Sequence, residues 1–209
     1  MYKKIAPFVI FLFAGCVTET TTMSNDENIA MTTNHASLLM EPTWAVLFSG
    51  DDLENFNEIG GADWQLAEGS VSAVSGDPGF LVSKFAVGNF SLRATFTAST
   101  DTNSGIFIRC ESSEFVDAES CYEINIFDLN QNLAFRTGSI LRVQAPLNEV
   151  MVGSNESILE IQATNNRIQV WVNGVQTADV EDGTHISGYI GLQYNTGPIS
   201  FSEVLFRPE

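Results

Sequence analysis

From about residue 64 to the C-terminus, apolar and polar residues alternate in short runs. The clearest sign is Asn173-Gly174, which separates two such runs, because both central residues of a two-residue hairpin turn need a positive φ. Turn-forming residues divide the other runs, and no convincing long amphipathic helix pattern interrupts them. We therefore predict an all-β domain built as a sandwich or barrel. The runs are Ser91–Ala98, Ile158–Ala163, Arg167–Val172, Val175–Val180, Tyr189–Tyr194 and Ile199–Phe206.

The N-terminal segment has the pattern of an export signal. A short basic segment precedes the uncharged run Ile5–Gly15, which is too short to span a bilayer but has the length of a signal-peptide apolar region. The end of the run and the next residue, Phe13-Ala14-Gly15-Cys16, resemble a bacterial lipobox, where the cysteine is lipidated and becomes the mature N-terminus. We predict a signal peptide over 1–15 and lipidation of Cys16; an ordinary signal peptide with an incidental cysteine is the alternative. Val17 at the next position fits sorting to the outer membrane.

The segment after Cys16 differs in composition from the rest of the chain. Val17–Glu41 is rich in Thr, Asn, Ser and Glu and has no aromatic residue, which predicts a flexible tether over 16–41 and a folded domain over 42–209. The chain has 9 Lys+Arg against 26 Asp+Glu, a net charge of −17. Such an acidic surface repels phosphate backbones and excludes a nucleic-acid partner. We expect a protein of the bacterial cell envelope that contacts the membrane only through its lipid anchor.

The chain has three cysteines, one near the N-terminus and two in the predicted domain. If Cys16 carries lipid, Cys110 and Cys121 remain, at the end of one predicted strand and the start of the next. Outside the cytoplasm such a pair is expected to form a disulfide, which would join two antiparallel strands at the base of the polar loop 111–120. A two-cysteine metal site is the alternative, but no histidine nearby in the sequence would complete it.

Alternation also separates two faces of the runs 105–110 and 122–127. The aliphatic residues and Tyr122 share one face, which we expect to be core. The other face combines a charged pair, an amide and two aromatic rings, and such groups suit a sugar, whose C–H faces pack on rings while its hydroxyls bind planar polar groups. A structural ion pair with two rim aromatic residues is the alternative, and from parity alone it is the commoner arrangement. The residues of this second face are Phe107, Arg109, Glu123, Asn125 and Phe127.

Several segments, in order along the chain, resemble the family called domain of unknown function 1080, whose members are described as 3-keto-disaccharide hydrolases or 3-keto-glycoside lyase/hydratase domains. The most specific is Asn103–Arg109, which is similar to the family pattern N-S-G-I-f-f-R. The resemblance covers about residues 44–207. The other segments are Leu47–Phe56, Trp64–Gly69, Lys84–Arg93, Tyr122–Asp128, Val170–Gly174 and Gly188–Gln193.

The resemblance implies a concanavalin A-like jelly-roll sandwich and a substrate glycoside whose C3 hydroxyl has been oxidised to a carbonyl. Elimination from such a sugar needs a general base near C2, an acid for the leaving group and a group that stabilises the enolate oxygen. Residue matching makes Glu123 the candidate base or acid and Arg109 the candidate enolate stabiliser, which would also keep Glu123 ionised. The candidate substrate-binding residues are Asn103, Asn125 and Gln193, with Phe107 and Phe127 from the aromatic face and Asp128 from the motif.

Two hypotheses about function remain open at this stage. The first is a keto-glycoside lyase or hydrolase that acts on a small-molecule or oligosaccharide substrate. The second is a lipoprotein of the same fold that binds glycans without cleaving them, because this chain lacks a Trp before Ile158 and has Tyr194 where the family often has a histidine. We expect no cofactor and no metal site. The Asp128–Asn132 run leaves a loose Ca²⁺ site as an alternative to a solvated turn, since it lacks the complete EF-hand pattern. The oligomeric state is left open.

Overall fold

The computed structural model describes residues 43–209. The predicted signal peptide, the lipidation at Cys16 and the whole tether therefore lie outside the described residues, as does Pro42, the first position of the predicted domain. In the described part of the chain, no helix is long and apolar enough to cross a membrane.

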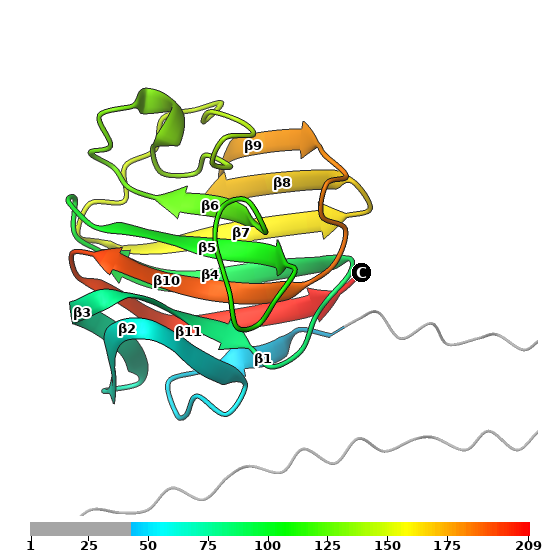
Figure 1. Cartoon of the computed structure of the whole chain (residues 1–209). Helices are drawn as coiled ribbons and strands as arrows, with labels where there is room; N and C mark the ends of the chain where they lie inside the picture. Colours follow the sequence, from blue (N-terminus) through cyan, green and yellow to red (C-terminus); the bar gives the residue numbers. More distant parts are fainter. Residues whose placement is uncertain (1–42) are drawn as a thin grey trace, which may run out of the picture. The chain divides into compact units, whose positions relative to one another are not determined.

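The described residues form a nearly all-β sandwich in which every strand pair is antiparallel (Figure 1). One layer contains β2, β3, β10, β5 and β6, and the other contains β1, β11, β4, β7, β8 and β9. This confirms the predicted all-β jelly-roll class. The strands are β1 (Ala45–Phe48), β2 (Phe56–Ala67), β3 (Ser70–Ser83), β4 (Phe90–Ala98), β5 (Asn103–Cys110), β6 (Tyr122–Ile126), β7 (Glu156–Thr164), β8 (Arg167–Val172), β9 (Val175–Glu181), β10 (Tyr189–Thr196) and β11 (Ile199–Pro208), with one 3₁₀ turn, η1 (Leu133–Phe135).

The long strand β3 connects the two layers. Its first half pairs with β11 through Val71–Ala73, and its second half pairs with β10 through Gly79–Val82. Between these segments Gly76 has a φ of +102°, and a Cβ there would lie 2.4 Å from the carbonyl oxygen of Gly61. Glycine is the residue that tolerates both conditions, so the chain turns from one layer into the other at this point.

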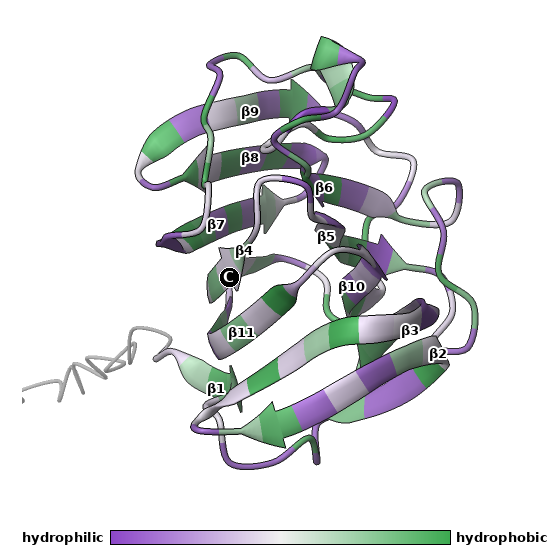
Figure 2. Cartoon of the chain, turned by 90° about the vertical axis from the view of Figure 1, so that its left-hand side faces the viewer, coloured by the Kyte–Doolittle hydropathy of each residue, from purple (hydrophilic) through white to green (hydrophobic). Residues whose placement is uncertain are grey.

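Hydrophobic and hydrophilic residues alternate along many of the strands, which gives the ribbon in Figure 2 its green and purple bands. The apolar side chains fill the space between the layers. Ile106, Ile124 and Leu192 from one layer are fully buried in the same cluster as Phe96 and Phe201 from the other. The opposite faces of the same strands are therefore free to carry polar groups.

The local predictions agree with the structure except at the start of the domain. The Asn173-Gly174 turn joins β8 to β9 with φ values of +50° and +77°, which confirms the hairpin. The first strand begins at Ala45 rather than near residue 64. Glycines at 60 and 61 interrupt the alternation of β2, and β1 is only 4 residues long, so neither strand produces a clear periodic signal.

Candidate active site

Two rows of residues cross the outer face of the layer β2-β3-β10-β5-β6. Each row contains one position from every strand, since directly paired residues of neighbouring strands share a face. In these two rows Glu123 is the one carboxylate. The first row is Ile59, Phe80, Gln193, Gly105 and Asn125, and the second is Asn57, Val82, Gly191, Phe107 and Glu123.

Glu123 has an unusual environment for a carboxyl group. Its exposed fraction is 7%, and burial raises its pKa from 4.5 to about 7, while the positive charge of Arg142 acts in the opposite direction. Burial disfavours the charged form of a carboxyl group, so the acid keeps its proton over a wider range of pH. At neutral pH this group is present in both forms, as a general acid or base should be.

Two amide side chains of the first row, on the same face as Glu123, have unpaired buried oxygens. Asn125 donates a hydrogen bond from Nδ2 to the carbonyl of Phe135, but its Oδ1 has no partner within residues 43–209. The Oε1 of Gln193 is buried and also has no partner in this part of the chain. A buried acceptor without a donor costs free energy, so these oxygens are suited to accept hydrogen bonds from a ligand that carries hydroxyl groups. We call Glu123, Asn125 and Gln193 the Glu123 cluster.

Gly105 lies between the members of this cluster. It pairs with Asn125 on β6 and with Gln193 on β10. A Cβ at this position would lie 3.5 Å from Glu123 Oε1 and 3.0 Å from the carbonyl oxygen of Ile124. The missing side chain therefore allows the β6 backbone and the Glu123 carboxyl group to lie close against β5.

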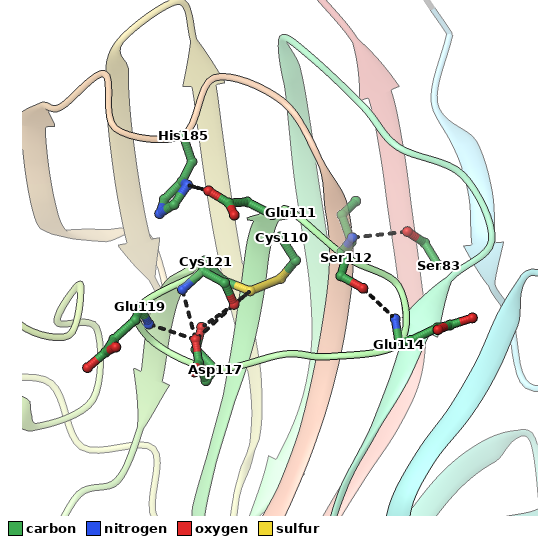
Figure 3. The surroundings of a disulfide bond; sticks show 11 residues. Ser83, Cys110, Glu111, Ser112, Glu114, Asp117, Glu119, Cys121 and His185 are labelled. Atoms are coloured by element: carbon green, nitrogen blue, oxygen red, sulfur yellow. Dashed lines mark hydrogen bonds and ion pairs between the residues drawn. A yellow bond between two sulfur atoms is a disulfide. The ribbon is translucent and has the colours of Figure 1, made fainter.

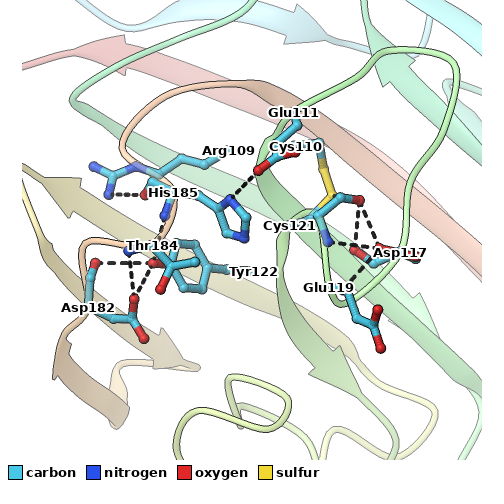
Figure 4. Close-up of polar contacts among 11 residues, drawn as sticks. Arg109, Cys110, Glu111, Asp117, Glu119, Cys121, Tyr122, Asp182, Thr184 and His185 are labelled. Atoms are coloured by element: carbon cyan, nitrogen blue, oxygen red, sulfur yellow. Dashed lines mark hydrogen bonds and ion pairs between the residues drawn. A yellow bond between two sulfur atoms is a disulfide. The ribbon is translucent and has the colours of Figure 1, made fainter.

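The structure does not bring Arg109 to Glu123, contrary to the predicted pairing. Arg109 has a φ of +56°, and the β5–β10 register shifts so that Ile108 and Arg109 together oppose Ile190. Such a bulge interrupts the alternation of side chains, so that Arg109 points to the opposite face of the sheet from the one expected. Figure 4 shows the result: Arg109 Nη1 donates to the carbonyl oxygen of His185 at 3.1 Å, on the side of Tyr122.

Arg109 is fully buried at this place, and its Nε and Nη2 have no hydrogen-bond partner among the described residues. Burial lowers its pKa below the usual range for arginine. Its one hydrogen bond holds the segment 182–188, where the Tyr122 hydroxyl donates to Asp182 Oδ1 and accepts from the amide of His185. The geometry thus gives Arg109 a positioning role for this segment.

The predicted disulfide is confirmed (Figure 3). The loop that it closes covers part of the second row. Val116, from the loop between Cys110 and Cys121, packs in one apolar cluster with Val82 and Phe107. Phe107 is consequently buried rather than available for stacking on a sugar, which corrects the expectation from alternation. Alternation describes a strand, and it does not reveal a loop that folds back over the sheet.

The other predicted substrate-binding residues have different surroundings. Asp128 lies beyond the end of β6 and accepts hydrogen bonds from Thr137 Oγ1 at 2.6 Å and from the amide of Gly153 at 2.8 Å. Its carboxylate therefore organises the segment 127–155, which corrects its assignment to the substrate. Asn103 and Phe127 are partly buried and, by alternation, extend the face beyond the first row.

Two residues near the cluster were not predicted from the sequence. Phe80 is partly buried beside Gln193 and contacts Phe107 edge-to-face at 5.0 Å, so it is an aromatic neighbour of the cluster. Arg142 lies in the irregular segment 127–155 and forms an ion pair with Glu119 of the disulfide loop at 3.2 Å. Phe80 lies in a strand, so its side of the sheet follows from its position relative to its neighbours. Arg142 lies in an irregular segment, where residue spacing does not indicate the direction of a side chain.

The Glu123 cluster has the donor atoms for a hard cation, one carboxylate and two amide oxygens. The pKa of Glu123, about 7, also suits this carboxyl group to proton transfer. Within residues 43–209, no group of three or more His, Cys, Asp or Glu side chains is arranged to hold a metal ion.

Comparison with solved structures relates this fold to carbohydrate-active proteins. Two proteins from Parabacteroides distasonis, both described as candidate glycosyl hydrolases, match with TM-scores of 0.66 and 0.69 at 23% and 15% identity. These matches cover 80% and 79% of this chain and 100% and 94% of the other chains. A β-1,3-1,4-glucanase (lichenase) derived from a mouse hindgut metagenome matches with a TM-score of 0.55 at 12% identity, over 81% of this chain and 100% of the glucanase. Likeness at these identities shows the fold.

Sequence comparison assigns the chain to a family. No curated protein sequence matches it significantly. The family model described as the 3-keto-alpha-glucoside-1,2-lyase-like domain matches residues 43–207, which confirms the family indicated by the motifs. With nearly all of the described residues inside this match, the chain belongs to the carbohydrate-active family of 3-keto-alpha-glucoside-1,2-lyase-like domains.

Proposed function

We propose that this domain cleaves the glycosidic bond of 3-keto-glycosides and that Glu123 transfers the proton. The observation that supports this proposal most is the pKa of Glu123, about 7, on a polar sheet face. A group with this pKa can take a proton from carbon and return it to oxygen at neutral pH. The unpaired oxygens of Asn125 and Gln193 offer acceptors for the hydroxyl groups of the same sugar.

The chemistry needs one acid–base group. Glu123 takes the hydrogen on C2, which the C3 carbonyl acidifies, and the electron pair forms an enolate. The enolate collapses to the C3 carbonyl, a C1=C2 double bond forms, and the bond from C1 to the aglycone oxygen breaks; Glu123 returns its proton to that oxygen. Water then adds its hydroxyl to C1 and its hydrogen to C2. Glycosidases of the usual kind need two carboxylates, so the single carboxylate of the two rows favours the keto-sugar route.

Negative charge develops on the C3 oxygen during this reaction, and Arg142 is the better candidate to stabilise it. Its side chain is 58% exposed and its charge already acts on Glu123. Arg109 is fully buried and oriented toward His185, so it stabilises the site through the segment 182–188 rather than through the substrate. A positive group aimed at developing charge lowers the barrier for a step of this kind.

The proposal is tested by incubating the full chain with a 3-keto-disaccharide and measuring release of the free sugar. We expect release by the parent protein and none from the unoxidised disaccharide. Glu123→Gln keeps size and hydrogen bonding but cannot exchange the proton, so kcat should fall by about 100-fold or more. Glu114→Gln, an exposed change in the disulfide loop, is the matched control and should keep parental turnover.

The same experiment separates the two hypotheses. Saturable binding of the 3-keto-disaccharide without release of sugar would support the glycan-binding alternative and contradict the enzyme. Turnover by Glu123→Gln at the parental rate would also contradict the role given to this carboxyl group.

We propose in addition that lipid on Cys16 holds the domain at the bacterial cell envelope, at the outer membrane. The support is the sequence itself: an uncharged run that ends in Ala-Gly-Cys16, followed by Val17. A domain placed outside the cytoplasm is also in a compartment where the Cys110–Cys121 disulfide persists.

A further inference from the structure

A second polar and aromatic site lies on the layer that does not contain the Glu123 cluster. A surface cavity of about 440 Å³ opens on the outer face of β4, β7, β8 and β11. Its lining combines two indole rings with charged and amide groups. The residues that matter for the argument are Trp44, Arg93, Glu160, Gln162, Trp171 and Arg207.

The register of the sheet builds this cavity from neighbouring strands. Arg93 on β4 pairs with Glu160 on β7, which pairs with Trp171 on β8. Their chain neighbours Leu92 and Ile161 are buried in the core, so these three side chains share the outer face. Gln162 follows two positions after Glu160 and therefore lies on the same face, where it and Trp171 are partly exposed.

Ion pairs and ring contacts hold the polar groups in place. Arg93 donates from Nε and Nη2 to Glu160 Oε1 at 3.0 and 2.7 Å, and Arg207 pairs with Glu209 at 2.6 Å. The guanidinium carbons of Arg93 and Arg207 lie 5.4 and 5.1 Å from the ring centroid of Trp44. A cation over an indole face is attracted to it, so Trp44 is held at the rim of the cavity.

The charges of the site identify the class of ligand. Each arginine has a carboxylate partner, so the cavity has little net charge, and the chain as a whole has a net charge of −17. An anionic polysaccharide would be repelled by such a protein. A surface cavity with at least partly exposed indole rings and oriented polar groups is suited to a neutral sugar chain, whose C–H faces pack on rings while its hydroxyls bind amide and charged groups.

We propose that this cavity is a second carbohydrate-binding site, which holds a neutral glycan chain independently of the Glu123 cluster. The ring of Trp171 packs on a pyranose, and Arg93, Glu160 and Gln162 bind its hydroxyl groups. The site lies on the opposite layer from Glu123, so it retains glycan at the protein surface and does not take part in bond cleavage.

The test is electrophoresis of the full chain in native gels that contain a soluble polysaccharide. The probes are mixed-linkage β-1,3-1,4-glucan, soluble starch as an α-1,4-glucan, and carboxymethyl cellulose as an anionic chain. We expect retardation by at least one of the two neutral glucans and none by carboxymethyl cellulose. Trp171→Ala should weaken the affinity for the retarding glucan at least tenfold, and Gln162→Ala, a milder surface change, at least threefold.

Two control variants separate this site from other surfaces. Phe115→Ala removes an exposed ring from the disulfide loop and should bind as the parent does. Glu123→Gln should also keep parental binding, which distinguishes this site from the proposed active site. The inference is wrong if neither neutral glucan retards the parent, if carboxymethyl cellulose does so equally, if Trp171→Ala and Gln162→Ala both bind as the parent does, or if Glu123→Gln loses the binding.

Discussion

Glu123 on β6 and Gly105 on β5 are diagonal neighbours across the two strands: a Cβ at Gly105 would lie 3.5 Å from Glu123 Oε1 and 3.4 Å from its Cγ. The glycine therefore determines where the carboxyl group can lie. Burial also raises the pKa of this carboxyl group to about 7. Close packing against β5 therefore bears on both the position of the carboxyl group and its protonation. This relationship connects the packing of the sheet face to the proposed chemistry.

Gly105→Ala should reduce turnover more than stability. The new methyl group would lie 3.0 Å from the carbonyl oxygen of Ile124, which would have to give by a few tenths of an ångström, and in van der Waals contact with Cγ and Oε1 of Glu123. A shift of this β6 backbone would carry the neighbouring Glu123 with it. Since proton transfer depends on hydrogen-bond geometry, we expect kcat to fall by about 10-fold or more, with the free energy of unfolding lowered by about 1–2 kcal/mol. Steady-state kinetics and urea unfolding would measure the two effects. Gly88→Ala is the control, because a Cβ there meets no atom within 4 Å; equal kinetics for both variants would contradict the relationship.

The raised pKa of Glu123 predicts how stability changes with pH. Well below pH 4.5 the carboxyl group is protonated in both the folded and unfolded states, so its titration does not change the free energy of unfolding. Between 4.5 and about 7 the unfolded state loses its proton while the folded state keeps it, so the free energy of unfolding falls as pH rises and stays lowered above 7. Glu123→Gln removes this effect. Its stability relative to the parent should rise by about 3 kcal/mol between pH 4 and pH 8.

Urea unfolding of both proteins across this range would measure that difference. Other titrating groups are shared by the two proteins and cancel. A difference in unfolding free energy that does not vary with pH would mean that Glu123 has an ordinary pKa, and the proposed proton transfer would lose its main support.

Much of this fold follows from residue order alone. Side chains alternate along a strand, so the buried position of Ile124 and the outward position of Glu123 were both predicted correctly. The Asn173-Gly174 turn was equally clear, since few other dipeptides adopt two positive φ values.

The errors at the site have specific physical causes. One bulge residue at positive φ reverses the side on which Arg109 lies, and nothing in the local pattern marks it. The burial of Phe107 depends on where the loop 111–120 folds, which is a tertiary property. Arg142 reaches the vicinity of Glu123 from an irregular segment without any period, so sequence patterning had no means of placing it.

The disulfide should contribute to stability as well as to covering the sheet. Cys110 and Cys121 are separated by 11 positions, and closing a loop of this size restricts the unfolded chain. We expect the double variant Cys110→Ser with Cys121→Ser to lose about 2–3 kcal/mol in free energy of unfolding. Reducing agent should destabilise the parent in urea unfolding and leave the double variant unchanged. An equal response of both proteins to reduction would show that the effect has another origin.

Cys16→Ser tests the proposed anchor. Lipid can be attached only to the cysteine, so the variant should move from the membrane fraction to the soluble fraction of the cell envelope. Fractionation and immunoblotting would measure the distribution. Cys110→Ser, which removes a cysteine of the folded domain, is the control and should leave any folded protein in the membrane fraction. Continued membrane association of the Cys16 variant would refute the anchor.

Arg142→Gln should change the pH dependence of turnover. The positive charge of Arg142 lowers the pKa of Glu123, in opposition to the larger effect of burial, so removing the charge should raise that pKa further. If Glu123 removes the C2 hydrogen as a base, kcat/KM rises with pH around 7 in the parent, and the midpoint of this pH profile should move to higher pH in the variant.

A second effect of Arg142→Gln is a lower maximal rate, because the developing enolate loses its stabilising charge. Arg136→Gln, on the same irregular segment and paired with Glu149, is the matched control and should keep the parental midpoint. A midpoint that does not move in Arg142→Gln would show that the charge of Arg142 does not act on Glu123, and an unchanged maximal rate would assign the enolate oxygen to another group.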